Sequence, residues 1–261
     1  MMPVALTIAG SDPSGGAGIQ ADLKTFHQMG VYGMSVVTLV TVQNTCRVDA
    51  IEILPADIVR GQIDAVLEDI PPGAAKTGAL GSGDIVALVA EKARAFPFPL
   101  VVDPVMISKH GLPLMDEHAR SVLEQELLPS AFLVTPNLHE AGALARMRVQ
   151  DLESMEEAAR IIAGRGAQNV LVKGGHLEGD AVDLLYGGGR VRCFSSPRIH
   201  TRSTHGTGCT FSAAITACLA KGDGLERAVA AAKGYITRAI ETNPGLGRGS
   251  GPVNHHARVG Q

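Results

Sequence analysis

The chain has 261 residues, of which 45% are hydrophobic and 19% are charged, and its formal net charge is -3. We expect residues 1–261 to form one α/β domain, because no Ser-rich, Gln-rich or single-charge linker divides them. The Lys and Arg residues are scattered, which leaves no basic patch of the kind that binds nucleic acid. The expected partner is a small soluble ligand.

The cysteines and the N-terminus indicate a cellular location. Cys46, Cys193, Cys209 and Cys218 form no C-x-x-C pair, which favours a reduced protein in the cytoplasm. The N-terminus has no basic region before its short apolar run, and no apolar stretch approaches the roughly 20 residues that span a bilayer. The sequence therefore predicts neither an export signal nor a membrane segment.

Short β-prone runs alternate with helical patterns along the whole chain, which is typical of βαβ units around a mostly parallel sheet. The predicted strands are 4–9, 33–42, 74–76, 100–103, 132–135 and 169–173. The predicted helices are 19–29, 56–69, 83–95, 116–128, 137–145, 154–165, 207–220 and 225–241. Residues 182–186 and 191–194, joined by a glycine-rich turn, predict a β-hairpin near one edge of the sheet.

Polar or glycine-containing segments follow six of these strands at their C-terminal ends. They are Gly10-Ser11-Asp12, Gln43-Asn44, Thr77-Gly78, Asp103-Pro104, Pro136-Asn137 and Gly174-Gly175-His176. In an open parallel sheet that edge binds ligands. We expect the six segments to converge on one cleft.

The segment from Ser203 to Thr210 places Gly206 and Gly208 directly before a helical pattern. Unpaired backbone N–H groups and the helix dipole make such an N-terminus a site for anions, and glycine lets the ligand approach closely. The functional interpretation is an anion hole. The alternative is a turn that merely begins a buried helix.

The first glycine-rich loop contains Gly16-x-Gly18-x-x-Ala21, a loose dinucleotide fingerprint. A dehydrogenase is disfavoured, because four residues separate the strand from the glycines and the next strand ends in Gln43 rather than an acidic residue. A Walker A loop is absent. Two interpretations remain equally favoured: a loop over a small polar ligand with Asp22 facing it, or glycines that pack a helix on the sheet.

Two side chains at strand ends suggest ligand contacts. The Gln43 carboxamide can donate and accept, which suits the edge of a nitrogen heterocycle, although it could equally bind loop backbone. Lys173 ends a buried-type strand, where a lone ammonium group is unfavourable without an anion. Its partner is either a phosphate or an internal carboxylate.

Asp103 and Glu140 are acidic residues expected at the same edge of the sheet. Kinases hold Mg²⁺ through one or two carboxylates, with phosphates supplying further ligands. The alternatives are a loop cap for Asp103 and an ion pair for Glu140. A zinc site built from His200, His205 and Cys209 has little support, because its spacing matches no usual zinc pattern.

Taken together, these motifs resemble the hydroxymethylpyrimidine/phosphomethylpyrimidine kinases of thiamin biosynthesis, which belong to the ribokinase-like superfamily. The resemblance covers the chain from about Val4 to His255. It rests on the glycine-rich loop 10–25 together with Gln43-Asn44-Thr45, Lys76-Thr77-Gly78, Val102-Asp103-Pro104-Val105-Met106, Thr135-Pro136-Asn137-Leu138, Val172-Lys173-Gly174-Gly175-His176 and His205-Gly206-Thr207-Gly208-Cys209-Thr210.

The resemblance implies a three-layer α/β fold with a mostly parallel central sheet, a homodimer, and two ATP-dependent steps at one site. 4-Amino-5-hydroxymethyl-2-methylpyrimidine becomes its monophosphate and then its diphosphate. The residues that it implies for the pyrimidine are Gln43, Gly10, Asp22 and Val42. Those implied for phosphate and ATP are Gly206, Thr207, Gly208, Cys209, Lys173 and Asn137, with Asp103 and Glu140 for Mg²⁺.

Cys209 stands where most sugar kinases of the superfamily carry Asp. A thiolate favoured by the helix N-terminus would accept the substrate proton in the first step, whereas the second step, on an ionised phosphate, needs no base. Two residues depart from the family pattern: Ala79 replaces a common Met, which predicts a roomier pocket, and His139 replaces a frequent Pro.

Two other functions compete with this assignment. A pyridoxal kinase would phosphorylate a similar hydroxymethyl group on a similar flat ring, and Ala79 makes that activity more plausible. A non-catalytic sensor would need only the pyrimidine-binding residues. The presence of Asp103, Glu140, Lys173 and Cys209 together argues against a sensor.

Overall fold

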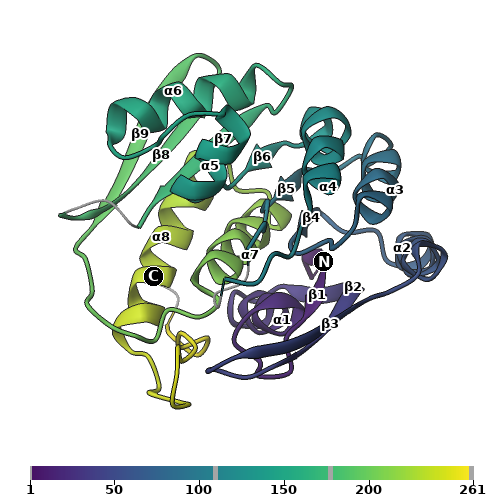
Figure 1. Ribbon diagram of the computed structural model, residues 1–261, viewed down its shortest axis with the longest axis horizontal. Helices are drawn as coiled ribbons and strands as arrows, with labels where there is room; N and C mark the ends of the chain where they lie inside the picture. The colour runs from purple at the N-terminus through teal and green to yellow at the C-terminus, as the bar shows by residue number, and fades with distance from the viewer. Residues whose placement is uncertain (1, 108–110, 176–178, 259–261) are drawn as a thin grey trace.

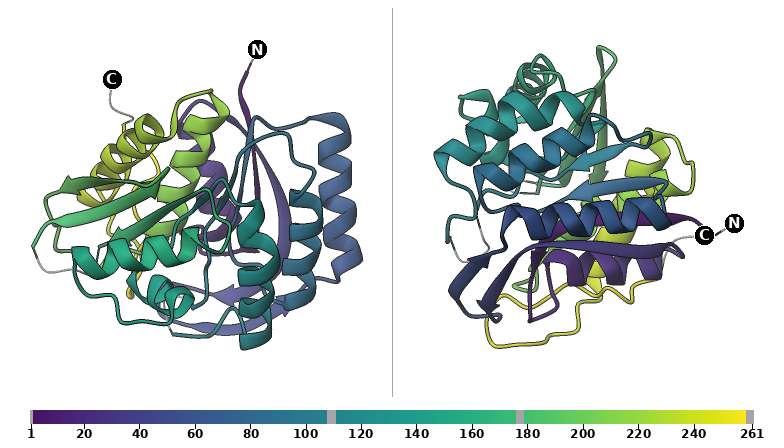
Figure 2. Two further views of the ribbon diagram at one scale, coloured as in Figure 1. Left: turned by 90° about the horizontal axis from the view of Figure 1, so that it is seen from above. Right: turned by 90° about the vertical axis from the view of Figure 1, so that its right-hand side faces the viewer.

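The computed structural model describes residues 2–107, 111–175 and 179–258 (Figure 1). Within these ranges the strands form one sheet in the order β3-β2-β1-β4-β5-β6-β7-β8-β9. Helices cover both of its faces, which gives the three layers predicted (Figures 1 and 2). His176, part of one polar segment singled out in the sequence, lies outside the described residues.

The centre of the sheet is parallel and its two margins are antiparallel. The parallel strands are β1 (Val4–Ser11), β2 (Tyr32–Gln43), β4 (Ala74–Thr77), β5 (Leu100–Val102), β6 (Leu133–Val134) and β7 (Asn169–Gly174). The antiparallel strands are β3 (Val48–Ile53), β8 (Ala181–Gly187) and β9 (Arg190–Ser196). All six predicted strands are confirmed, whereas β3 was not predicted.

The β8–β9 hairpin lies at the sheet edge, as predicted. Its turn residues Gly188 and Gly189 have φ angles of 55° and 74°. Positive φ at both central positions is the requirement of a two-residue type I′ turn, which glycine meets without strain. The glycine run therefore explains both the position and the sharpness of the turn.

The helices divide between the two faces of the sheet. One face carries α1 (Gly18–Gln28), α7 (Thr207–Ala220) and α8 (Leu225–Glu241). The other carries α2 (Ala56–Asp69), α3 (Gly83–Ala93), α4 (Glu117–Val122), α5 (Leu138–Ala145) and α6 (Leu152–Ala163). Among the described residues, no helix is long and apolar enough to cross a bilayer.

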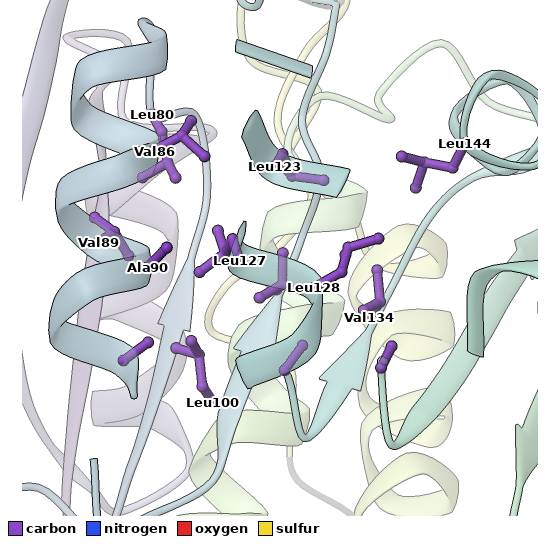
Figure 3. Packing of buried hydrophobic residues seen from close by; sticks show 14 of the residues in the cluster. Leu80, Val86, Val89, Ala90, Leu100, Leu123, Leu127, Leu128, Val134 and Leu144 are labelled. Atoms are coloured by element: carbon purple, nitrogen blue, oxygen red, sulfur yellow. The ribbon is translucent and has the colours of Figure 1, made fainter. Parts of the chain in front are cut away.

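Each face of the sheet has its own hydrophobic core, because alternate residues of a strand point to opposite sides. On β5, Leu100 and Val102 belong to the core under α2–α6, and Val101 belongs to the core under α1, α7 and α8. Figure 3 shows Val89 of α3 and Leu127 within the first of these cores. Strands buried on both faces explain the continuous apolar runs in the sequence.

The helix predicted over 116–128 is only partly regular. The Asp116 carboxylate caps its start by accepting the Ala119 N–H at 2.7 Å. After Val122 the backbone widens into a π-helical segment, Leu123–Leu127, and ends in a 3₁₀ turn, Leu128–Ser130. The leucines at 123, 127 and 128 are all buried. Core packing therefore prevails over the regular helical period here.

Candidate active site

A cavity of about 680 Å³ lies at the carboxyl ends of the parallel strands. This volume is within the range of small-molecule sites. Each of the six polar segments contributes to its wall, through Gly10, Gln43, Gly78, Asp103, Asn137 and Gly175. The predicted convergence on one cleft is confirmed.

The N-terminus of α7 forms one part of the wall. Its N-cap residue Gly206 has φ = 76°, and a Cβ there would lie 1.7 Å from the Gly16 carbonyl oxygen, so only glycine fits. Helix geometry leaves the N–H groups of the first turn, including those of Gly208 and Cys209, without intrahelical partners. A Cβ on Gly208 would lie 3.2 Å from Lys173 Nζ. Backbone donors and an ammonium group therefore lie close together, an arrangement that suits an anion.

Lys173 has an internal partner at this site. Its Nζ donates to Asp103 Oδ1 at 2.9 Å, and Asp103 also accepts from the hydroxyls of Thr135 and Ser212, each at 3.2 Å. Burial opposes ionisation of Asp103, but the nearby Lys173 and Lys76 charges hold its pKa below the ordinary value. Burial likewise opposes protonation of Lys173, and Asp103 and Glu140 outweigh it and raise its pKa. The pair is therefore ionised.

Asn137 and Glu140 form a reciprocal capping box at the start of α5. Asn137 Oδ1 accepts the Glu140 N–H at 2.9 Å, and Glu140 Oε2 accepts the Asn137 N–H at 2.8 Å. Burial raises the pKa of Glu140 to about 7, and the Asp103 charge adds to this against the effect of Lys173. The cap fixes Glu140 in the cavity wall beside the ionised pair.

The donor set fits Mg²⁺ rather than a closed transition-metal site. Asp103 and Glu140 both line the cavity, and among the described residues no three His, Cys, Asp or Glu side chains form a metal cluster. Mg²⁺ typically takes one or two protein carboxylates and completes its shell with water and phosphate oxygens. Bound there, it would neutralise part of the negative charge on the phosphates of a nucleoside triphosphate.

Cys209 lies in the first turn of α7 and lines the cavity. Burial raises the pKa of its thiol to about 11, although the Lys76 charge and the Gly18 N–H act in the opposite direction. Loss of hydration thus opposes the thiolate that the helix N-terminus favours, and the neutral thiol is the main form at pH 7. The proton-accepting role of Cys209 stays a prediction.

Two residues predicted for the substrate lie away from the cavity wall. Asp22 is fully buried on α1, and its Oδ2 accepts from Thr7 Oγ1 at 2.6 Å and Lys76 Nζ at 2.8 Å. Lys76 lines the cavity in its place. Val42 is 59% exposed, because Thr41 and Gln43 take the cavity side of β2 and the side chain between them points the other way.

Two buried pairs on the wall were missed from the sequence. Lys233 of α8 donates to Asp183 of β8 at 2.7 Å, and the Asp12 carboxylate lies 2.7 Å from His205 Nε2. Their members are separated by 50 and 193 positions, so no local pattern connects them. His205, considered above for a zinc site, has this carboxylate as its partner.

The sequence profile of the phosphomethylpyrimidine kinase family matches residues 12–254. The chain belongs to this family. The kinase is 45% identical to the hydroxymethylpyrimidine/phosphomethylpyrimidine kinase of Bacillus subtilis, over 97% of this chain and 94% of that protein. It is 52% identical to the thiamine biosynthesis bifunctional protein ThiED of Geobacter sulfurreducens, over 96% of this chain. The chain spans about half of that bifunctional protein, 51% of its length.

Solved structures confirm the ribokinase-like fold of the kinase. An ADP complex of Bacillus subtilis pyridoxal kinase superposes with a TM-score of 0.91 at 41% identity, covering 98% of both chains. Phosphomethylpyrimidine kinase from Clostridium difficile superposes with a TM-score of 0.81 at 45% identity, covering 91% of this chain and 99% of that one. Pyridoxal kinase from Staphylococcus aureus, in complex with AMP-PCP and pyridoxal, gives 0.90 at 37% identity, covering 98% and 95%.

Proposed function

We propose that the kinase transfers phosphoryl groups from ATP to 4-amino-5-hydroxymethyl-2-methylpyrimidine and then to its monophosphate, for thiamin biosynthesis. One observation carries the proposal: a single cavity presents the Gln43 carboxamide together with the N-terminus of α7 and the Lys173 ammonium group. The carboxamide suits an aminopyrimidine edge, and the helix N-terminus with the ammonium group suits phosphate. The names of the relatives from Bacillus subtilis and Haemophilus influenzae support the same substrates.

Different residues of the cavity wall have different roles in phosphoryl transfer. Gln43 orients the ring, and the Gly208 and Cys209 amides with the Lys173 ammonium hold phosphate oxygens. Such fixed donors act where charge develops, which is the main demand of this reaction. We assign Asn137 and Thr207, which also line the cavity, to the nucleotide, and Asp103 with Glu140 to Mg²⁺.

Cys209 has a role in the first step only. That step breaks the O–H bond of the hydroxymethyl group, and the proton goes to the small fraction of Cys209 that is thiolate, whose sulfur lines the cavity at the α7 N-terminus. The second step attacks with a phosphate oxygen that is already ionised. It requires the anion site and Lys173 but no base.

Pyridoxal is the second candidate substrate. Ala79 lines the cavity, and Thr38 Oγ1 donates to its carbonyl at 2.6 Å, which fixes the backbone around this small side chain. The similarity to pyridoxal kinases, with a TM-score of 0.91, supports a shared pocket shape. Its ring nitrogen and phenolic oxygen offer Gln43 a different hydrogen-bonding edge, so the pyrimidine should react with the higher kcat/KM.

The test is ATP turnover by the purified kinase with Mg²⁺ and each of three compounds: hydroxymethylpyrimidine, its monophosphate and pyridoxal. Both pyrimidines should turn over, and Gln43→Leu should raise KM for them at least tenfold. Gln125→Leu, on an exposed glutamine bound to Ser121, is the matched control. A preference for pyridoxal would move the activity to vitamin B6 salvage, and binding without turnover would indicate a sensor.

We also propose a cytoplasmic homodimer. All four cysteines are free thiols, which supports a reducing location. Strand β3 is the last strand of the sheet, and Val40 and Val42 leave apolar surface exposed on the outer face of the neighbouring β2. Light scattering after size-exclusion chromatography should give twice the chain mass, and Val42→Glu should shift the protein toward the monomer.

A further inference from the structure

The Asp12 carboxylate joins two distant segments of the cavity wall. It is 3% exposed, and its Oδ1 accepts from the Ser14 N–H at 2.8 Å and the Ser14 hydroxyl at 2.7 Å. Its Oδ2 accepts from the N–H groups of Gly16 at 3.2 Å and Ala17 at 2.8 Å, and lies 2.7 Å from His205 Nε2. One side chain thus shapes the first glycine loop and binds the residue before Gly206.

Ionisation of Asp12 strengthens this arrangement. Burial alone would raise its pKa, but the hydrogen bonds from His205 and Ser14 hold the pKa far below the ordinary value. At neutral pH the acceptor is therefore a carboxylate, and hydrogen bonds to a charged acceptor are shorter and stronger than neutral ones.

His205 is also fixed through its backbone. Its N–H donates to the Gly251 carbonyl at 3.0 Å, and its own carbonyl accepts from the Val253 N–H at 3.4 Å. The same C-terminal segment reaches the loop after Gln43, where the Ser250 N–H donates to the Thr45 carbonyl at 2.8 Å. In Figure 1 this yellow segment passes beside the loop between β2 and β3.

The loop around Gly16 and the loop around Gly206 are in close contact. A Cβ on Gly206 would lie 1.7 Å from the Gly16 carbonyl oxygen, and a Cβ on Gly16 would lie 2.5 Å from His205 Cδ2. A shift of the first loop therefore displaces the N-cap of α7. The Gly208 and Cys209 amides belong to the first turn of the same helix, so their positions depend on that of the N-cap.

We propose that Asp12 and His205 are a positioning pair that aligns the anion site at the α7 N-terminus with the substrate side of the cavity. The inference rests on the function proposed above and adds to it a reason for the Asp-Pro-Ser-Gly-Gly and His-Gly-Thr-Gly sequences to occur together. Neither residue needs to touch the reacting atoms. Misplacement of the anion site by about 1 Å can cost roughly 10²-fold in rate.

Three variants test the pair. His205→Leu removes the ring nitrogen, Asp12→Asn removes the charge, and His205→Gln keeps an N–H near the position of Nε2. We expect His205→Leu and Asp12→Asn to lower kcat of both phosphorylations about 10²-fold while KM for the pyrimidine changes less than threefold. His205→Gln should recover kcat to within tenfold of the wild type.

A matched control separates positioning from local stability. Asp151 accepts from the N–H and hydroxyl of Ser154 as Asp12 does from Ser14, but it caps α6 outside the cavity. Asp151→Asn should leave kcat unchanged. The double variant Asp12→Asn/His205→Leu should lose no more activity than the worse single variant. The proposal would be overturned if a folded His205→Leu variant kept the kcat of the wild type. It would also be overturned if the losses of activity in the two single variants added up in the double variant.

Two further measurements keep the test decisive. If His205→Leu does not fold, Asp12→Asn and His205→Gln carry the comparison, with circular dichroism and Tm as the measures of folding. If the wild type phosphorylates no pyrimidine, the proposed function fails, and calorimetric binding of AMP-PCP then tests the pair. Weakening by at least fivefold in Asp12→Asn would support positioning, and unchanged affinity in every variant would refute it.

Discussion

The Cys209 thiol is held in two opposing environments, a helix N-terminus that favours negative charge and a buried site that disfavours it. Its pKa of about 11 means that roughly one molecule in ten thousand carries a thiolate at pH 7. We predict that Cys209→Ala lowers monophosphate formation about 10²- to 10⁴-fold and diphosphate formation less than tenfold. Single-turnover rates with each pyrimidine measure both. Equal losses in the two steps would refute a proton-accepting role.

The pH dependence of the first step follows from the same pKa. An acid whose pKa is raised gains its ionised form only at higher pH, so kcat/KM for hydroxymethylpyrimidine should still rise between pH 8 and pH 10. The second step should be flat over this range. A plateau of the first step below pH 8 would show that a different group receives the proton.

Residue types at strand ends correctly predicted which side chains reach the cavity at two positions. Gln43 and Lys173 lie on the cavity wall because each ends a strand at the ligand edge of the sheet. Asp22 and Val42 do not lie on the cavity wall, for physical reasons that a sequence motif does not show. Asp22 has the buried Lys76 as partner, and Val42 follows the two-residue alternation of β2. Their assignment to the substrate remains a prediction.

Between elements, α8 is joined to the β8 strand by one buried ion pair. Lys233 Nζ donates to Asp183 Oδ2 at 2.7 Å and to the Ala181 carbonyl at 2.8 Å, and Asp183 Oδ1 accepts the Gly174 N–H. We predict that Lys233→Met destabilises the fold by about 3–5 kcal/mol, because it leaves a buried carboxylate without its counter-charge.

Urea denaturation measures this loss. The exposed pair Arg60–Glu91, at 2.9 Å, is the control, and Arg60→Met should change the free energy of unfolding by less than about 1 kcal/mol. The double variant Lys233→Met/Asp183→Asn should recover part of the loss. A Lys233→Met variant as stable as the control would contradict the prediction.

At the scale of elements, the sequence predicted those that have a local signal. The βαβ alternation and the glycine turn of the hairpin located most strands and helices. Strand β3 was missed because its pattern is weak: Asp49 and Glu52 interrupt it, and its residues are half-buried or exposed. The π-helical segment Leu123–Leu127 was missed because it depends on core packing against α3, not on a local pattern.

For the whole molecule, the C-terminal segment should make stability depend on pH. Burial lowers the pKa of His255 to about 4, and its Nε2 lies 3.1 Å from Thr210 Oγ1 of α7. Above pH 6.5, its ordinary pKa, the imidazole is neutral in both the folded and the unfolded chain, so it makes stability independent of pH there. As pH falls from 6.5 toward 4, the unfolded chain binds the proton first, and stability should fall by up to about 3 kcal/mol.

A comparison with His255→Gln isolates this contribution, because other titrating groups act equally in both proteins. The stability advantage of the wild type should shrink as pH falls from 6.5 to 4, measured by urea denaturation at each pH. His256→Gln, at the exposed neighbouring position, is the control. If the stability difference between the wild type and His255→Gln stays constant from pH 6.5 to pH 4, the buried imidazole does not contribute to the loss of stability in acid.

The central claim is that one cavity performs two successive phosphorylations. The most direct measurement is a ³¹P NMR time course of the wild-type kinase with ATP, Mg²⁺ and hydroxymethylpyrimidine. A monophosphate signal should appear first and then decline as the diphosphate signals grow. Accumulation of the monophosphate without any diphosphate, or no new phosphate ester at all, would contradict the account.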